Sequence, residues 1–139
     1  MDPVSQAVVG AIVPQSIGRR RPLAAIALVG GLAGMAPDLD IFIRSSTDPL
    51  LFLVYHRQFT HSLIFIPIGA LLCTMALWPL MRRWLELKTV FWTALLGFGS
   101  HGVLDACTTY GTLLLWPFSD VRVAWNNVSV VDPLFTLPV

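Results

Sequence analysis

The sequence predicts an all-α protein, a multi-pass transmembrane helical bundle with a loop-rich C-terminal segment at the membrane interface. Hydrophobic residues make up 55% of the 139 residues and charged residues only 12%, and the mean hydropathy is +0.72. Soluble domains carry about 25% charged residues, and a chain this short could not bury so much apolar surface. Lipid is therefore the favoured solvent. The length fits a single domain, residues 1–139, with about three or four membrane helices, some of them short.

The expected helices are the four stretches without Lys, Arg, Asp or Glu, which cover residues 3–18, 22–36, 62–81 and 89–104. The first contains Pro14, and the second is rich in glycine, which suits close helix packing in lipid. Only residues 62–81 reach the length of about 20 residues that crosses about 30 Å of hydrocarbon. The other three are expected to be tilted partial spans or helices packed inside the bundle. After Asp105 the pattern changes to a loop, in which Trp116-Pro117-Phe118 is typical of an interfacial anchor.

Basic residues flank the apolar stretches at Arg19, Arg20 and Arg21 and again at Arg82, Arg83 and Lys88. Such clusters normally mark the cytoplasmic side of a membrane segment, and the net charge of +1 does not indicate nucleic acid. Between the clusters the chain must cross the membrane outward and back. This topology gathers the polar residues of the apolar regions on the non-cytoplasmic face, with Gln6 at the same level. They are Asp38, Asp40, His56, His61, His101 and Asp105.

These histidines and aspartates are candidate metal ligands, because ionisable residues in or beside membrane segments are costly and often functional. His101 and Asp105 are four positions apart and share one helix face. Asp38 and Asp40 follow a proline and would offer carboxylates from a turn. His56 and His61 are five apart, so we expect one in a loop and one at a helix start. Nitrogen and oxygen ligands favour a divalent metal, zinc before manganese or iron, over a thiolate site.

A catalytic ion would activate water toward an ester or phosphoester of a lipid or amphiphilic substrate. Arg57 is the candidate for stabilising an anionic substrate group, since a guanidinium matches phosphate geometry. Thr60 is the second candidate catalytic residue. Gln6, Ser62 and Thr109 are expected to form hydrogen bonds around the ligands. The sequence thus predicts a membrane-bound metal-dependent hydrolase.

Each residue also has a simpler interpretation. His61 could cap a helix, His101 could be a core histidine, Asp38 and Asp40 could face water, and Asp105 could pair with an arginine. A non-enzymatic scaffold with a structural metal or polar cluster is therefore the alternative function, and an ion pathway is a third. The sequence lacks the G-x-S-x-G turn of serine hydrolases and a phosphate-binding loop, which excludes those two classes.

Taken together, the motifs resemble those of the LexA-binding, inner-membrane-associated metal-dependent hydrolases of bacteria and archaea. The matching strings are MDPVSQAVVGA, GMAPDLD, HRQFTHS, HGVLDACTTYGT, WPFS and VDPLFTLP. The resemblance implies an inner-membrane hydrolase, a metal bound by the six residues named above, and a protein partner. Relatives often have histidine in place of Gln6, which implies a missing or weaker ligand here. They also commonly continue beyond the last motif, so the chain is expected to be a fragment or a minimal version.

Overall fold

The computed structural model describes residues 1–17, 22–42 and 57–137, and these ranges form a helical bundle without a β-strand. His56 and the cluster Arg19–Arg21 lie outside the described residues. The helices are α1 (Pro3–Ile17), α2 (Leu23–Met35), α4 (Ile66–Met81), α5 (Leu87–Ala106) and the short α6 (Pro133–Thr136). Two 3-10 helices, η1 (Ala36–Phe42) and η2 (Phe59–His61), lie between α2 and α4. The prediction of an all-α fold is confirmed for this part of the chain.

The helix boundaries follow local chemistry. The carboxylate of Asp2 accepts a hydrogen bond from the backbone N–H of Ser5 at 2.9 Å, which caps the start of α1. Pro67 stands in the first turn of α4, where its missing N–H costs nothing. The α2 helix does not end in a turn before Asp38, as the sequence suggested, but continues directly into η1. The carboxylates of η1 are therefore held on a helical turn.

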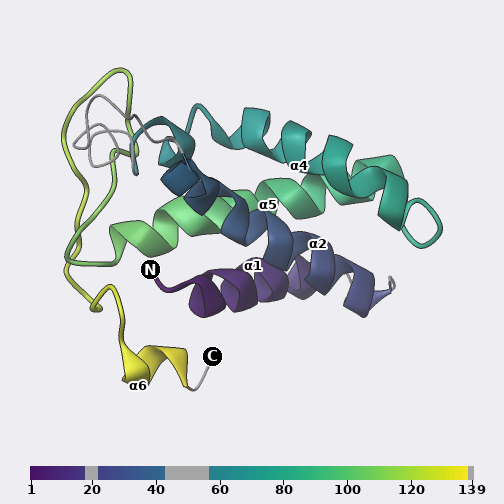
Figure 1. Cartoon of the computed structure of the whole chain (residues 1–139), viewed down its shortest axis with the longest axis horizontal. Helices are drawn as coiled ribbons and strands as arrows, with labels where there is room; N and C mark the ends of the chain where they lie inside the picture. The colour runs from purple at the N-terminus through teal and green to yellow at the C-terminus, as the bar shows by residue number, and fades with distance from the viewer. Residues whose placement is uncertain (18–21, 43–56, 138–139) are drawn as a thin grey trace.

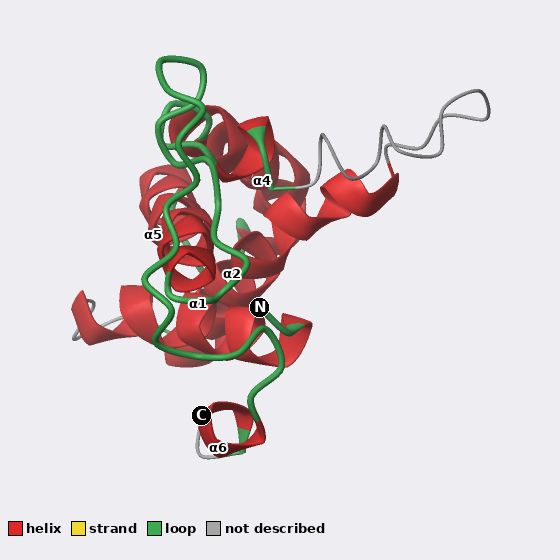
Figure 2. Cartoon of the chain, turned by 90° about the vertical axis from the view of Figure 1, so that its left-hand side faces the viewer, coloured by secondary structure: helices red, strands yellow, loops and turns green. Residues whose placement is uncertain are grey.

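The long helices lie side by side and alternate in direction (Figure 1), with α1 packed on α2 and α5, and α4 packed on the other side of α5. As a result, the start of α1, the end of α2, the start of α4 and the end of α5 meet at one end of the bundle. Seen from that end, the C-terminal loop runs past the end of α5 (Figure 2). Residues far apart in the sequence are thereby brought to the same depth.

Glycines allow the close approach of α1, α2 and α5. A Cβ atom added to Gly10 would lie 2.6 Å from the carbonyl oxygen of Gly30, and one added to Gly34 would lie 2.7 Å from that of Gln6. One added to Gly97 would overlap the carbonyl oxygen of Gly30. Gly30 and Gly34 form the small-x-x-x-small pattern of tightly packed membrane helices. We call this contact of Gly10, Gly30, Gly34 and Gly97 the glycine contact.

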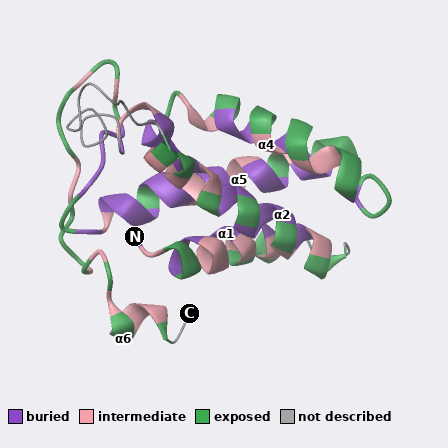
Figure 3. Cartoon of the chain, viewed as in Figure 1, coloured by how far each residue is buried: buried purple, intermediate pink, exposed green. Residues whose placement is uncertain are grey.

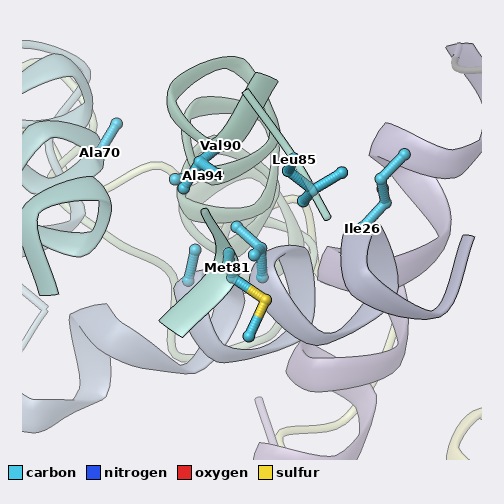
Figure 4. Packing of buried hydrophobic residues seen from close by; sticks show 8 residues of the cluster. Ile26, Ala70, Met81, Leu85, Val90 and Ala94 are labelled. Atoms are coloured by element: carbon cyan, nitrogen blue, oxygen red, sulfur yellow. The ribbon is translucent and has the colours of Figure 1, made fainter. Parts of the chain in front are cut away.

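A compact group of apolar side chains fills the bundle between α2, α4 and α5 (Figure 4). Its members are Ile26, Val29, Ala33, Ala70, Met81, Leu85, Val90 and Ala94. The outer surfaces of the four long helices are also apolar, and Figure 3 shows exposed residues along each of them. Large exposed hydrophobic residues there include Ile12, Leu28, Met75 and Trp92. An apolar exterior of this extent is typical of a surface that lipid covers.

Among the described residues, the only helical run that is both long and apolar enough to cross a membrane is Leu23–Phe42, which joins α2 and η1. The sequence instead favoured residues 62–81, but α4 begins only at Ile66 and has 16 residues. Its start is delayed because Ser62 to Phe65 form turns, with the Ser62 hydroxyl donating to the carbonyl of Phe59 at 2.7 Å. The structure thus supports one spanning segment by composition, and multi-pass topology stays a prediction.

The segment after α5 is mostly irregular, as the sequence predicted. It is tied to the bundle through backbone hydrogen bonds, among them Leu63 N–H to the carbonyl of Leu114 at 2.9 Å and Trp125 N–H to that of Ala106 at 2.7 Å. It ends at α6, where the Thr136 hydroxyl donates to the Asp2 carboxylate at 2.9 Å. The loop is therefore anchored beside the end of the bundle where the polar residues gather.

Candidate metal centre

Four of the predicted ligands come together at this end of the bundle. Asp38 is placed by η1, His61 by the last residue of η2, and His101 and Asp105 by consecutive turns of α5. Each offers one ligand atom, and the four atoms all lie within 4.8 Å of one another. Three of the residues are buried, whereas the Asp38 side chain is 23% exposed. The cluster therefore opens to its surroundings on the Asp38 side.

The distances within the cluster are short. The Nε2 atoms of His61 and His101 are 2.9 Å apart. The Asp38 Oδ1 atom lies 3.3 Å from His101 Nε2 and 3.6 Å from His61 Nε2. The Asp105 Oδ2 atom lies 3.3 Å from His61 Nε2 and 3.6 Å from His101 Nε2. Two imidazole nitrogens and two carboxylate oxygens thus face one point.

The backbone of α2 fixes the proton of His101. His101 Nδ1 lies 2.5 Å from the carbonyl oxygen of Gly34, and a carbonyl can only accept, so Nδ1 carries the proton. In the neutral ring, Nε2 then presents its lone pair to the cluster. This is the orientation in which histidine ligands of metals are usually held.

Asp40 and Thr60 fix the position of the proton on His61. The Thr60 hydroxyl donates to Asp40 Oδ2 at 2.8 Å. Its oxygen lies 2.8 Å from His61 Nδ1, and with its only proton given to Asp40 it must accept from that nitrogen. The lone pair of His61 Nε2 is therefore directed at the cluster as well. Gly102 makes room for this arrangement, since a Cβ there would lie 2.9 Å from the carbonyl oxygen of His61.

Asp105 has a different environment at each of its oxygens. Oδ1 accepts hydrogen bonds from the Gln6 amide at 3.0 Å and from the amino group of Met1. Oδ2 faces the two histidines, lies 3.2 Å from Arg57 Nε, and has no hydrogen-bond partner among the described residues. A buried acceptor without a hydrogen-bond partner is costly. Arg57 supplies a positive charge to this oxygen, and a cation in the cluster would supply a second.

The cluster fits a divalent metal ion. Four acceptor atoms at such distances repel one another unless a cation or a proton lies among them. Zinc bonds to nitrogen and oxygen at about 2.0–2.2 Å, so the ligand atoms of one ion lie at most about 4.4 Å apart, close to the spread observed here. A proton is the competing cation. Burial opposes a charge on His61, but the carboxylates of Asp105 and Asp38 outweigh it and raise the pKa of the imidazole above 6.5.

Arg57 connects the cluster to the C-terminal loop. It is buried, and its backbone has a φ of 62°, a conformation that non-glycine residues adopt only when their surroundings enforce it. Here its N–H lies 3.2 Å from Asp40 Oδ2, to which it donates, and its carbonyl accepts from Leu113 N–H at 3.3 Å. Its guanidinium carbon lies 4.8 Å from the ring centroid of Tyr110. The side chain is thus held between Asp105 and a half-exposed aromatic ring.

The other predicted site residues have distinct positions. Asp40 is bound to Arg57 and Thr60 and orients His61 from outside the group of four ligand atoms, and Gln6 binds Asp105. The Ser62 hydroxyl bonds to the backbone of its own turn. Thr109 is exposed.

Sequence reasoning missed two residues next to the cluster. Thr108 is fully buried, and its hydroxyl accepts from Arg57 Nη1 at 3.4 Å. Its position three residues after Asp105, on nearly the same helix face, was the available signal. The carbonyl of Gly34 gave no signal, because a backbone acceptor leaves no mark on residue type.

Comparisons with known proteins agree with a membrane location. The family model described as YdjM inner membrane protein matches residues 1–139. The chain is similar to the inner membrane protein YbcI of Escherichia coli, with 34% identity over 107 residues, which are 73% of this chain and 60% of YbcI. It is also similar to the uncharacterized protein YfhP of Bacillus subtilis, with 28% identity over 84% of this chain and 36% of YfhP. The chain thus spans less than two thirds of either relative. No solved structure matches it.

Proposed function

The chain belongs to the YdjM inner membrane protein family, and from this premise we propose that it is a membrane-bound hydrolase that depends on a divalent metal ion, zinc before manganese or iron. The proposed substrate is an ester or phosphoester of a lipid or another amphiphile. The resemblance to LexA-binding hydrolases supports the reaction class. The protein partner that it implies stays part of the proposal, without an assigned surface.

The observation that carries the proposal is the convergence of four acceptor atoms from Asp38, His61, His101 and Asp105 within 4.8 Å. Both imidazoles are oriented by hydrogen bonds at Nδ1, so their lone pairs point inward. Asp105 Oδ2, which forms an ion pair with Arg57 Nε at 3.2 Å, points to the same place. Four acceptors that face one another inside a membrane bundle need a cation among them, and we infer a metal ion in preference to a proton on His61.

Three residues of the chain would have distinct roles in hydrolysis. When bound, a divalent ion lowers the pKa of a coordinated water toward neutrality and polarises the substrate oxygen. Asp38 is the partly exposed ligand, so the substrate would approach the cluster from its side. Arg57 would stabilise negative charge that develops on the substrate. Its pairing with Asp105 at 3.2 Å keeps the guanidinium beside the cluster. Thr60 would act through His61, which makes it a positioning residue.

The charge distribution supports a non-cytoplasmic position for the site. Arg82 and Arg83 follow α4 directly and Lys88 lies in the first turn of α5, at the end of the bundle opposite the cluster (Figure 1). Positive residues beside apolar segments favour the cytoplasmic side. We therefore place the cluster near the outer interface of the inner membrane, in a chain that crosses the membrane several times.

Elemental analysis of detergent-purified protein tests the metal. We expect about one zinc or manganese ion per chain, and its loss in His101→Ala. Ser100→Ala is the matched control and should keep the ion, because within the described part of the chain the Ser100 hydroxyl bonds only to the carbonyl of Gly97. Absence of the ion from both the wild-type protein and Ser100→Ala would contradict the proposal.

The reaction is tested with a panel of long-chain carboxylic esters, phosphodiesters and phospholipids in mixed micelles. Hydrolysis should stop on treatment with a chelator and return when the metal is added back. Unchanged turnover by metal-free protein would refute the mechanism. The burial of three of the four ligands favours one rival, a scaffold with a structural ion. That rival predicts metal without turnover, and loss of folding whenever a ligand is removed.

A further inference from the structure

A groove opens in the bundle surface beside the metal cluster. It has a volume of about 400 Å³ and lies between η1, η2 and α4, with α5 at its base. Along α4 it extends from Phe65 past Gly69 to Ala76. The distance from Gly69 to Ala76 is about 10 Å at about 1.5 Å per helical residue. The groove is therefore elongated along the bundle axis.

The two ends of the groove differ in chemistry. Its walls are apolar over most of their length, with Leu72 and Ala76 on α4 and Phe98 on α5. Polar side chains enter only at the end nearest the cluster, where Asp40 and Thr60 line it. These two residues bind each other and orient His61. The groove thus offers a long apolar channel with a polar end, which matches an amphiphile.

The absence of a side chain at Gly69 shapes the base of the groove. The ring of Phe98 packs directly on Gly69, where any Cβ atom would overlap it. Because the outer edge of the ring is seated at Gly69, the ring lines the base of the groove. The packing therefore preserves the groove and does not fill it.

The size of the groove selects its occupant. A helix with its side chains is about 10–12 Å across. A single file of methylene groups, which contact neighbouring carbons at about 3.5–4.0 Å, is much narrower. Binding sites for small ligands have volumes of about 300–1,000 Å³ and mostly apolar walls. A hydrocarbon chain fits these limits, and the membrane around the protein supplies it.

We propose that this groove binds one acyl chain of a membrane lipid, with the polar part of the lipid at Asp40 and Thr60. The lipid then lies along α4, with its head at the depth of the metal cluster. Binding of the chain does not require catalysis, so the proposal can hold or fail independently of the hydrolase proposal.

The test is photolabelling in vesicles of phosphatidylethanolamine and phosphatidylglycerol that contain a phosphatidylglycerol with a diazirine on one acyl chain. Mass spectrometry locates the labelled residues on α4. The groove residues Leu72, Cys73 and Ala76 should carry several times more label than Leu71 and Met75, which do not line the groove. Even labelling around the exposed surface of α4, as freely exchanging lipid gives, would overturn the proposal.

A pair of variants sharpens the result. Ala76→Trp fills the far end of the groove and should lower groove labelling about tenfold, because it displaces several methylenes from their apolar contacts. Met75→Trp, its neighbour on the lipid-facing side, should leave labelling unchanged. Equal labelling in both variants would overturn the proposal, and if Ala76→Trp does not accumulate, the wild-type map decides alone. Both should keep their metal, so the hydrolase proposal is tested separately.

Discussion

The glycine contact and the metal cluster differ in what packs the helices together: absent side chains at the first and crowded polar side chains at the second. At the glycine contact, helices approach because side chains are absent, and a Cβ at Gly10 or Gly34 would come within 2.6 or 2.7 Å of a carbonyl oxygen. At the cluster, polar side chains crowd together, and four acceptors lie within 4.8 Å. The first region is complete with protein atoms alone, whereas we propose that the second binds a cation. Substitutions should therefore weaken folding in the first region and cation binding in the second.

Asp105→Ala should have the largest effect, because Asp105 belongs to both folding and the cluster. Removing it leaves Arg57 buried without its carboxylate, which costs about 3–5 kcal/mol of unfolding free energy, and also removes a ligand. Asp38→Ala is the comparison, since Asp38 is partly exposed and lies as close to the histidines as Asp105 does, at 3.3 and 3.6 Å. It should lose the metal with little change in unfolding free energy in detergent. Equal destabilisation by both variants would contradict the distinction drawn here.

Gly97→Ala should have the next largest effect on the free energy of unfolding, with no direct effect on the ligands. The added methyl group meets the backbone of Gly30, which cannot rotate away, so we expect a loss of about 1–3 kcal/mol. Gly99→Ala is the matched control on the same helix, because its Cβ would meet only Ile66 at an ordinary 3.6 Å. Thermal unfolding of the two variants in one detergent gives the comparison. A Gly97→Ala protein as stable as wild type would show that α2 and α5 can move apart at little cost in free energy.

Thr60→Val should affect metal binding more than folding. Without the hydroxyl, the Asp40 carboxylate no longer fixes His61 through Thr60, and metal affinity should fall about 10–100-fold. Thr60→Ser restores the hydroxyl and should recover most of the affinity. Titration with zinc in a competing chelator measures both. If the valine variant binds as tightly as the serine variant, Thr60 does not orient the ligand.

The smallest effect is expected at Asp2, which caps α1 and binds α6. Partial burial opposes its charge, but hydrogen bonds from the backbone and hydroxyl of Ser5 and from Thr136 lower its pKa below 3.8. Its stabilising effect is therefore present above that value and is lost as the pH falls through the lowered pKa. Asp2→Ala should cost about 0.5–1 kcal/mol near neutral pH, and the difference from wild type should shrink below pH 3.8. Hydrogen exchange at the Ser5 amide measures this difference in stability. Asp120→Ala, at an exposed position, is the control.

The sequence predicted the helical fold and most of the cluster, because both follow from simple periodicity and charge. The four-residue spacing of His101 and Asp105 placed both on one face of α5, and the alternation of basic clusters placed Asp38 and His61 at the same end of the bundle. The start of α4 was misplaced, since apolar composition does not reveal the turns at residues 62–65. The role of Asp40 was also not predicted, because its hydrogen bonds to Arg57 and Thr60 depend on how η1 and η2 meet.

Gly34 belongs to the glycine contact and also contacts the metal cluster. Its missing side chain admits α1, while its carbonyl holds the imidazole of His101 at 2.5 Å. A displacement of α2 therefore also moves the carbonyl that holds His101. If the cluster holds a metal ion as proposed, its selectivity for one ion radius over another would depend in part on the tilt of apolar helices, and bilayer thickness and lateral pressure would then influence which metal the protein retains.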